Sequence, residues 1–528
     1  MEKNRIRKVV IAGGGTAGWV AACALTHQFR DLLDITLVES EAIGTVGVGE
    51  STIPTIRTFH RLLQIDEREF MRAVAGSFKL SISFENWRRP GDHYFHPFGT
   101  TGVNTWSCDF HQFWLESRRR GARSTLGDYC LETAASRKQR FGLFNHEDGE
   151  AQQWSMRWVQ SPTSMHRGNV SYAYHFDAAL YAAFMRSKCE GRGLKRIEGK
   201  IREVRQDPEN GYVQALVLED GQVVEGDLFI DCTGFRGLLI EQTLKTGYED
   251  WNNWLPCNRA VAMQVESDVP PVPYTRAIAH EAGWRWHIAL QHRVGCGWVF
   301  SSEHMSDDEA AARLRAAYPD DRLVREPWVV PFRTGRRRQA WNKNVVSLGL
   351  ASSFIEPLES TSIHLTLSAV TRLVQLFPFE GISQAVVDRY NKVSRDELEH
   401  IRNFIILHYH LNQRDEPMWK QCREMQLPPE LAERIQVFRD TAYAWQGEDE
   451  LFRLDSWTHC MLGQGVVPKD HHPLTRGLSD ADMQTLLQGV RRPIERAVQA
   501  MPQHHEFLKR YCPADPSVWH SRRRSTVG

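Results

Sequence analysis

A lysine and a glutamate stand in two distinctive local sequences of this chain. Lys79 lies within residues 77–87 (SFKLSISFENW), and Glu359 lies within residues 356–362 (EPLESTS). The amine of a lysine can donate hydrogen bonds, and the carboxylate of a glutamate can accept a proton. Taken singly, each has an ordinary interpretation. Lys79 reads as a lysine on an amphipathic surface, and Glu359 reads as an acid at the start of a helix.

A glycine-rich loop near the N-terminus is typical of a dinucleotide site. The apolar run 9–12 predicts a buried parallel strand, and residues 19–29 predict the helix that follows it. Gly13 permits a tight turn, Gly15 lets the backbone approach a pyrophosphate, and Gly18 allows close helix packing. The phosphates would rest at the helix N-terminus. The predicted loop residues are Gly13, Gly14, Gly15, Thr16, Ala17 and Gly18.

The second predicted strand, residues 35–39, ends in an acid that can bind ribose hydroxyls, Glu39. The segment 43–54 that follows is rich in glycine, which suits a backbone that moves or approaches a ligand closely. A plain surface loop is the alternative interpretation. The further residues predicted to contact the cofactor are Ser40, Ile43, Gly49, Glu50, Ser51, Leu350 and Ile363.

The glycine loop alone does not distinguish FAD from NAD. Residues 226–235 form another apolar strand after the charged stretch 200–225, and its position resembles the returning strand of flavoprotein monooxygenases. Near residues 345–351 those proteins usually carry Gly-Asp, and the Asp is missing here. No second G-x-G-x-x-G motif marks an NADH domain. We therefore predict FAD, reduced by a separate protein.

The chain carries the glycine loop, the lysine motif and the glutamate motif in this order, and in this it resembles the flavin-dependent halogenases, most closely the tryptophan-halogenase family. The resemblance runs from about Val9 to about Pro473. It implies an α/β fold of mixed α+β character: an FAD-binding, Rossmann-like flavoprotein-monooxygenase module with an inserted β-sheet region at residues 1–380. A mainly helical, substrate-covering lobe at residues 381–528 would pack with it as one unit.

The resemblance also implies the chemistry. In the family, reduced FAD and O2 oxidise chloride or bromide to hypohalous acid, which passes through a tunnel to a separate substrate pocket. Lys79 matches the lysine that receives the hypohalous acid there, and Glu359 matches its partner carboxylate. Thr361 and Ser362 match the halide-binding positions at a helix start. The family usually has Gly where this chain has Ser362, and a positive φ there would cost energy.

Four further residues are predicted to border the tunnel or the substrate pocket. The run 283–290 resembles the halogenase signature W-x-W-x-I-P, with Ala289 in place of proline. On a strand, its two tryptophans would point to one face. They would block direct oxygenation of the substrate, or they would be a core aromatic pair. The predicted residues are Trp284, Trp286, Ser360 and His96.

The helical pattern of residues 383–438 leads into a region, 443–465, where tryptophan-specific relatives grip the amino acid. This region does not reproduce their pattern cleanly. We therefore expect an electron-rich aromatic substrate such as indole or a tryptophan-like compound, with little to hold a zwitterion. The tail from about Ser521 is predicted to be disordered.

The composition of the chain argues against a nucleic-acid-binding protein, a metal site and a membrane-spanning segment. The chain has 528 residues, 41% of them apolar, and its 65 basic and 65 acidic residues balance, which gives no field that favours nucleic acid. The ten cysteines show no C-x-x-C pair or zinc spacing, so we expect reduced thiols and no metal site. No run reaches membrane-spanning length without charge or glycine. We expect a cytoplasmic protein that can form a homodimer and that receives flavin from an NAD(P)H-dependent flavin reductase.

Two other functions fit the same fold. A flavin-dependent monooxygenase would hydroxylate its substrate, and a flavin-binding carrier or regulator would do no chemistry. Neither of them needs both Lys79 and Glu359, so this pair favours halogenation.

Overall fold

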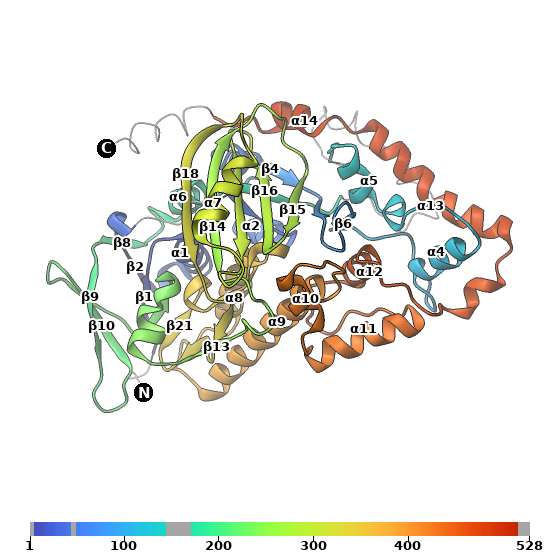
Figure 1. Ribbon diagram of the computed structural model, residues 1–528. Coiled ribbons are helices and arrows are strands. Elements are labelled where there is room, and N and C mark those ends of the chain that lie inside the picture. Colours follow the sequence, from blue (N-terminus) through green and yellow to red (C-terminus); the bar gives the residue numbers. More distant parts are fainter. Residues whose placement is uncertain (1–4, 44–48, 144–169, 516–528) are drawn as a thin grey trace.

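A six-stranded sheet built around the N-terminal strand organises the first half of the fold (Figure 1). The structure is a computed structural model that describes residues 5–43, 49–143 and 170–515. The strand order is β20-β21-β12-β1-β2-β8, and every neighbouring pair is parallel except β20 with β21. The strands are β1 (Lys8–Ala12), β2 (Asp34–Glu39), β8 (Lys195–Glu198), β12 (Leu228–Asp231), β20 (Trp341–Asn342) and β21 (Val345–Ser347).

Strand β1 is apolar because it is covered on both faces. Val9 and Ile11 pack with helix α1 (Thr16–Phe29), whereas Val10 and Ala12 pack with the three-stranded sheet β11-β10-β9. A central parallel strand needs such a continuous apolar sequence. The predicted strands at residues 9–12 and 35–39 are confirmed, and the strand predicted at 226–235 is present but shorter, because β12 covers only residues 228–231. The small sheet contains β9 (Ile201–Gln206), β10 (Val213–Leu218) and β11 (Val223–Glu225).

A seven-stranded sheet, ordered β18-β14-β17-β16-β15-β5-β6, stands beside the first. Its neighbours are antiparallel except β15 with β5. A three-stranded sheet, β3-β7-β4, lies next to it, and the chain passes directly from β4 into β5. The bounds are β3 (Gly49–Ser51), β4 (Ser77–Lys79), β5 (Ser81–Glu85), β6 (His93–Pro97), β7 (Ala173–Asp177), β14 (Arg259–Glu266), β15 (Tyr274–His280), β16 (Gly283–Ala289), β17 (Val294–Phe300) and β18 (Arg322–Pro331).

The last part of the chain is helical, as predicted, and Figure 1 shows α10 to α13 gathered on one side of the sheets. One hydrophobic cluster joins Phe84 and Trp284 of the large sheet to Phe404 of α9, Trp419 of α10 and Met461 of α12. The helices are α8 (Ser362–Gln375), α9 (Gln384–His410), α10 (Pro417–Glu424), α11 (Pro429–Thr441), α12 (Leu454–Gly463), α13 (Asp480–Ala500) and α14 (His504–Tyr511).

Shorter elements complete the described residues. They are α2 (Thr55–Leu62), α3 (Glu67–Ala73), α4 (Phe110–Arg119), α5 (Leu131–Arg137), α6 (Ala178–Cys189), α7 (Asp307–Ala316), and the sheet of β13 (Tyr248–Asp250), β19 (Gly335–Arg337) and β22 (Ser353–Phe354). Among the described helices, none combines the length and the apolar character that a membrane span requires. All ten cysteines are free. The predicted disorder from Ser521 lies outside the described residues.

A glycine makes room for a tryptophan in the large sheet. Trp286 on β16 pairs with Gly297 on β17, and a Cβ at position 297 would lie 2.0 Å from the Trp286 ring. It would also lie 2.6 Å from the Val261 carbonyl oxygen. The indole therefore lies flat across its neighbour strand only because that strand carries no side chain there.

We predict that Gly297→Ala lowers the free energy of unfolding by about 1–3 kcal/mol, because the added methyl overpacks a rigid site. Urea unfolding measures this. Gly489→Ala is the control: it lies in helix α13 with no described atom within 4 Å of its Cβ. That control should raise stability slightly. Equal effects of the two substitutions would contradict the packing argument.

Candidate active site

The glycine loop between β1 and α1 has the geometry that its sequence predicts. Gly13 has φ +108°, and a Cβ there would lie 2.4 Å from the Cys232 carbonyl oxygen. A Cβ on Gly18 would lie 1.9 Å from the Gly13 carbonyl oxygen, so the helix packs tightly on the turn. At Gly15, which precedes α1, no described atom lies within 4 Å of the Cβ position. The loop is thus tightly packed at Gly13 and Gly18 and open on the side of Gly15.

In front of this loop is a cavity of about 850 Å³. Its volume suits a large organic ligand. Of the predicted cofactor-binding residues, all except Gly18 line it, and Gly18 instead packs behind the turn. The predicted residues that line it are Gly13, Gly14, Gly15, Thr16, Ala17, Glu39, Ser40, Ile43, Gly49, Glu50, Ser51, Leu350 and Ile363. Residues 44–48 of the predicted strap lie outside the described residues.

The cavity has a polar end and an apolar end. Backbone N–H groups of α1 and the Glu39 carboxylate border the glycine loop. The guanidinium of Arg196 holds Glu39 in place, with Nε donating to Oε1 at 2.6 Å. Toward the large sheet the lining includes Trp286 and Phe354. Amides at a helix start bind phosphate, and an apolar slot accepts a ring system, so the donor set fits a flavin dinucleotide.

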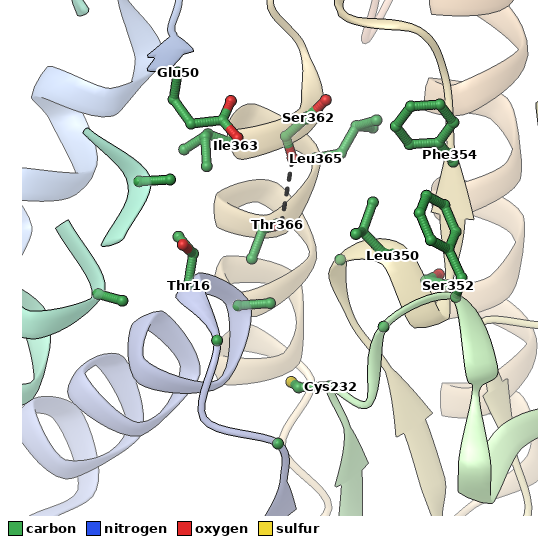
Figure 2. A pocket seen from close by; sticks show the side chains of 18 of the residues that line it. Thr16, Glu50, Cys232, Leu350, Ser352, Phe354, Ser362, Ile363, Leu365 and Thr366 are labelled. Carbon is green, nitrogen blue, oxygen red and sulfur yellow. Dashed lines mark hydrogen bonds between the residues drawn. The ribbon is translucent and has the colours of Figure 1, made fainter. Parts of the chain in front are cut away.

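A half-buried carboxyl group reaches into the cavity beside helix α8. Figure 2 shows Glu50 and Ser362 close to each other, with Thr16 and Cys232 farther along the wall. Burial raises the pKa of Glu50 to about 7, and the neighbouring Asp177 carboxylate raises it as well. Near neutral pH this group can therefore hold or release a proton.

Lys79 is fully buried at the end of β4, behind the wall of the cavity. Its Nζ donates to the Thr52 carbonyl oxygen at 3.1 Å and to Ser360 Oγ at 2.8 Å. Ser360 lines the cavity and Lys79 does not, so a hydroxyl separates the amine from the cavity. Burial lowers the pKa of Lys79 to about 7, although the Glu359 carboxylate opposes this shift. Amine and ammonium are both accessible at neutral pH.

Glu359 lies one residue before Ser360, at the end of the 3₁₀ helix η9 (Pro357–Glu359). Its Oε2 accepts from His96 Nδ1 at 2.8 Å, and its Oε1 lies 2.8 Å from His408 Nε2. The side chain is fully buried. Burial raises the pKa of Glu359, but the two imidazoles outweigh it and hold the pKa at about 2. Glu359 is therefore a carboxylate across the working pH range.

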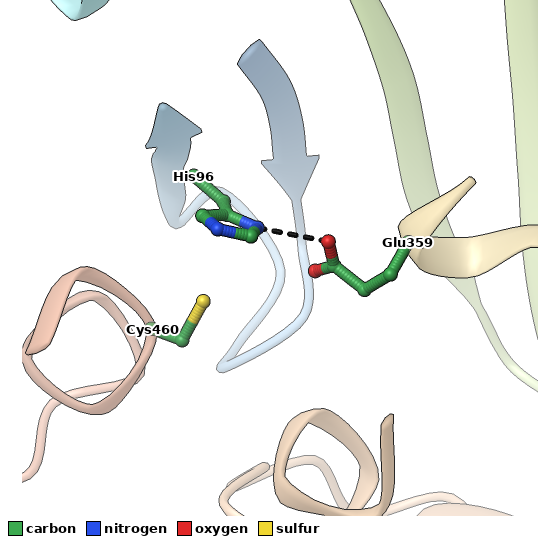
Figure 3. A group of neighbouring side chains, drawn as sticks. All are labelled: His96, Glu359 and Cys460. Atoms are coloured by element: carbon green, nitrogen blue, oxygen red, sulfur yellow. Dashed lines mark hydrogen bonds and ion pairs between the residues drawn. The ribbon is translucent and has the colours of Figure 1, made fainter. Parts of the chain in front are cut away.

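His96, which was predicted to border the substrate pocket, lies beside the Glu359 carboxylate (Figure 3). His408, on the last turn of α9, is a residue that the sequence analysis missed. Its Nδ1 lies 2.9 Å from the Tyr94 hydroxyl, and its ring stacks on Phe84 with centroids 4.4 Å apart. Burial lowers its pKa while Glu359 raises it. A histidine in a long amphipathic helix carries no local signal that could have identified it.

Cys460 of α12 completes the group drawn in Figure 3. The potential ligand atoms of His96, Glu359 and Cys460 all lie within 4.8 Å of one another. The His96–Glu359 hydrogen bond already occupies two of these atoms, and burial raises the pKa of the Cys460 thiol. A raised pKa disfavours the thiolate that a metal would need.

The two predicted halide-binding residues begin helix α8. Ser362 is its first residue and lines the cavity, and Thr361 is the preceding residue. Thr361 is fully buried, and its Oγ1 has no hydrogen-bond partner among the described residues. The left-handed residue of this turn is Ser360, with φ +60°, and not Ser362. The backbone cost considered for Ser362 therefore does not arise.

Trp284 and Trp286 share one face of β16, as alternation predicts, with ring centroids 6.4 Å apart. Only Trp286 lines the cavity. Trp284 is buried deeper, and its Nε1 donates to Glu356 Oε1 at 2.9 Å. Trp284 thus has the core position that was the alternative interpretation, whereas Trp286 has the position expected of a cavity wall.

The chain matches a known protein family over most of its length. The profile of the tryptophan halogenase family matches residues 8–480. The chain belongs to the tryptophan halogenase family. Tryptophan 6-halogenase SttH of Streptomyces toxytricini is 37% identical over 445 residues, which cover 82% of this chain and 84% of that protein.

Solved structures of flavin-dependent halogenases are similar to this chain over almost its whole length. Xcc4156, a flavin-dependent halogenase from Xanthomonas campestris, is 47% identical with a TM-score of 0.90, covering 97% of this chain and 99% of that chain. BrvH, a flavin-dependent halogenase from Brevundimonas sp. BAL3, is 42% identical with a TM-score of 0.89, covering 96% and 99%. The predicted flavoprotein-monooxygenase-like fold is confirmed. The protein is an enzyme of the flavin-dependent halogenase class, which sets the carrier and hydroxylase alternatives aside.

A second acid of the glutamate motif yields a pH prediction. Glu356 accepts from Trp284 and Tyr409 through Oε1, and its Oε2 has no partner among the described residues. Burial raises its pKa from 4.5 to about 7. A raised folded-state pKa gives stability that is complete below pH 4.5 and is lost as the pH rises through 7.

We predict that Glu356→Gln gains stability relative to the parent between pH 4.5 and pH 8, by about 3 kcal/mol at 1.4 kcal/mol per pKa unit. Urea unfolding at the two pH values measures the change. Glu433→Gln, at an exposed position of α11, is the control and should show no such trend. A stability difference that does not change with pH would refute the assignment.

Proposed function

We propose that this protein is a two-component FAD-dependent halogenase of electron-rich aromatic compounds such as indole or tryptophan-like molecules. Reduced FAD, supplied by a separate NAD(P)H-dependent flavin reductase, and O2 would oxidise bromide or chloride to hypohalous acid. The observation that carries the proposal is the position of Lys79 and Glu359. Both are fully buried behind Ser360, which separates Lys79 from a cavity of dinucleotide size.

The cavity residues would hold the cofactor. The N–H groups at the start of α1 would bind its phosphates, and Glu39 would bind ribose hydroxyls. Bound there in its reduced form, FAD would supply two electrons to O2, which takes two more from the halide and so yields hypohalous acid and water. Trp286 and Phe354, at the apolar end, would exclude water from the ring system.

The start of helix α8 would bind the halide. The backbone N–H groups of Thr361 and Ser362 are free of the helical ladder, and the positive end of the helix dipole favours an anion. Thr361 Oγ1, without a partner among the described residues, is a further donor at this place. Ser362 faces the cavity, so halide and cofactor would meet at this wall.

Lys79 would receive the hypohalous acid on the far side of Ser360. As an ammonium it would donate a hydrogen bond to the oxygen of the oxidant and make the halogen more electrophilic. As an amine it would attack the halogen and form an N–halogen bond, while the O–halogen bond breaks and the hydroxide leaves with the amine proton as water. A pKa of about 7 keeps both forms available. In either form, a fixed Nζ delivers the halogen to one point in space.

Glu359 would take the proton that the aromatic ring loses on halogenation. A carboxylate beside the ring also stabilises the cationic intermediate that precedes this loss. With a pKa of about 2 Glu359 is a weak base, but the ring cation is a strong acid. His96 Nδ1 and His408 Nε2, each 2.8 Å from a carboxylate oxygen, would stabilise the charged form of Glu359 before this transfer. The two histidines also hold the Glu359 carboxylate in one orientation.

The surroundings of Glu359 favour an aromatic substrate. Phe404 and Phe452 stack with centroids 3.8 Å apart, and Trp457 packs edge-on to Phe404 at 4.8 Å. The His96 ring lies 5.4 Å from Phe404. These flat groups continue from the carboxylate into the helical lobe, and an indole ring matches their shape.

A half-buried acid in this lobe is already engaged and is not free to hold a substrate ammonium group. Glu450 accepts from Arg434 Nη2 at 2.6 Å and from the Gly447 backbone N–H at 2.9 Å. Breaking such a buried pair would be costly. This supports substrates that lack the charged amino-acid group, with halogenation at the most electron-rich ring carbon.

We predict that Gly15→Val weakens FAD binding by at least about 100-fold while the protein still folds. Its side chain would enter the open space in front of the loop, where a dinucleotide backbone must approach. Fluorescence titration gives Kd, and circular dichroism reports the fold. Gly477→Ala, also without a described atom within 4 Å of its Cβ but outside the cavity lining, is the control. Unchanged FAD affinity in Gly15→Val would refute the placement.

The proposed function is tested with FAD, NADH, a flavin reductase, bromide or chloride, and indole or free tryptophan. We predict halogenated indole in preference to halogenated tryptophan, and product loss of at least about 1,000-fold in Lys79→Ala. Free hypohalous acid should still form in that variant. Lys469→Ala, an exposed lysine, is the control. Exclusive halogenation of tryptophan at a benzo-ring carbon would refute the substrate assignment, and near-normal turnover of Lys79→Ala would refute the role of Lys79.

A further inference from the structure

A continuous row of buried hydrogen bonds leads away from Lys79. Its Nζ donates to Ser360 Oγ (2.8 Å), which donates to Ser51 Oγ (3.0 Å). Ser51 Oγ lies 2.8 Å from Thr275 Oγ1, which lies 2.8 Å from His175 Nε2. All five residues are buried, and the three hydroxyl residues also line the cavity. The row therefore runs between the cavity and the amine.

The far end of the row fixes which way its protons point. Ser77 Oγ lies 2.6 Å from the Ala289 carbonyl oxygen and 3.1 Å from His175 Nδ1. A carbonyl can only accept, and a serine hydroxyl has one proton, so Ser77 donates to Ala289 and accepts from His175 Nδ1–H. In a neutral imidazole the other nitrogen, Nε2, is then an acceptor.

The charge state of His175 agrees with this tautomer. Burial lowers its pKa well below the ordinary value, and Lys79, His504 and His287 lower it further. The ring is therefore neutral and accepts from Thr275. Because the Thr275 hydroxyl donates its proton to His175 Nε2, its oxygen accepts from Ser51, and Ser51 in turn accepts from Ser360.

We propose that His175 is a positioning residue that orients Lys79 through the hydroxyls of Thr275, Ser51 and Ser360. With every hydroxyl proton directed toward His175, Ser360 can only accept from Lys79. The proposal rests on the function proposed for Lys79.

The geometry at Nζ makes the consequence specific. One N–H of Lys79 donates to Ser360 Oγ and another donates to the Thr52 carbonyl oxygen. The centre of the Phe98 ring lies 4.8 Å from Nζ. In the amine form these two bonds use both protons, so the lone pair remains free for the halogen. If the row were cut, the Ser360 hydroxyl could turn, donate to the amine and cover that lone pair.

Thr275→Val cuts the row with little change of shape, and Thr275→Ser restores the hydroxyl. Thr334→Val is the matched control, because Thr334 is buried, its Oγ1 has no partner among the described residues, and it does not line the cavity. We expect Thr275→Val to lower kcat for product about 10- to 100-fold, the effect of one hydrogen bond to a charged group. Thr275→Ser should recover most of the loss, and Thr334→Val should behave like the parent.

Two readouts separate positioning from a general structural effect. A 1,3-diketone that traps free hypohalous acid should give more trapped halogen per halogenated indole in Thr275→Val, as in Lys79→Ala. In the cofactor-free protein, ¹⁵N NMR of labelled histidines should show one neutral Nδ1–H ring whose Nε2 signal moves in Thr275→Val. That measurement needs no turnover.

The outcomes are distinct. If Lys79→Ala keeps normal activity, the proposed function fails. If Lys79→Ala loses product but Thr275→Val keeps the parental kcat and trapping ratio, the positioning role of His175 fails. An Nε2–H tautomer, a protonated ring, or an increase in the FAD Kd that accounts for the whole loss in Thr275→Val would also overturn it.

Discussion

The fold depends on burying two opposite charges, Lys79 and Glu359, with no access to water. Removing ions from water costs several kcal/mol for each ion, and only fixed partners offset this cost. The partners come from separate parts of the chain. The Thr52 carbonyl oxygen and Ser360 meet Lys79, whereas His96 and His408 meet Glu359. Strands β4 and β6, the turn before α8 and the end of α9 must therefore converge on one point.

The hydrogen-bonding partners of the two acids in this region, and not their degree of burial, make their pKa values differ. Glu356 and Glu359 lie three residues apart and are both fully buried. Burial raises the pKa of Glu356 to about 7, and its partners Trp284 and Tyr409 carry no charge. Two imidazoles hold the pKa of Glu359 at about 2. One short motif thus supplies a carboxyl group that takes up protons near neutrality and a carboxylate that stays charged.

Local chemistry explains what the sequence could predict. The glycine loop, its flanking strand and helix, and Glu39 are contiguous features whose backbone geometry follows from residue type, and all of them occupy their expected places. Alternation placed Trp284 and Trp286 on one face, but their different surroundings depend on Gly297 in another strand. His408 and Thr275 were unpredictable, because a histidine in a helix and a threonine in a strand are ordinary until folding brings them to Glu359 and Ser51.

The wall at Ser360 separates two sets of residues that can change independently. Every described residue that lines the cavity precedes residue 399, whereas His408, Phe452, Trp457 and Cys460 all follow it. Substitutions in α10 to α12 can thus reshape the far side without touching the cavity. Related enzymes could diverge in what they accept while inheriting the cavity intact. The same partition makes these helices the natural target for directed evolution of new specificities.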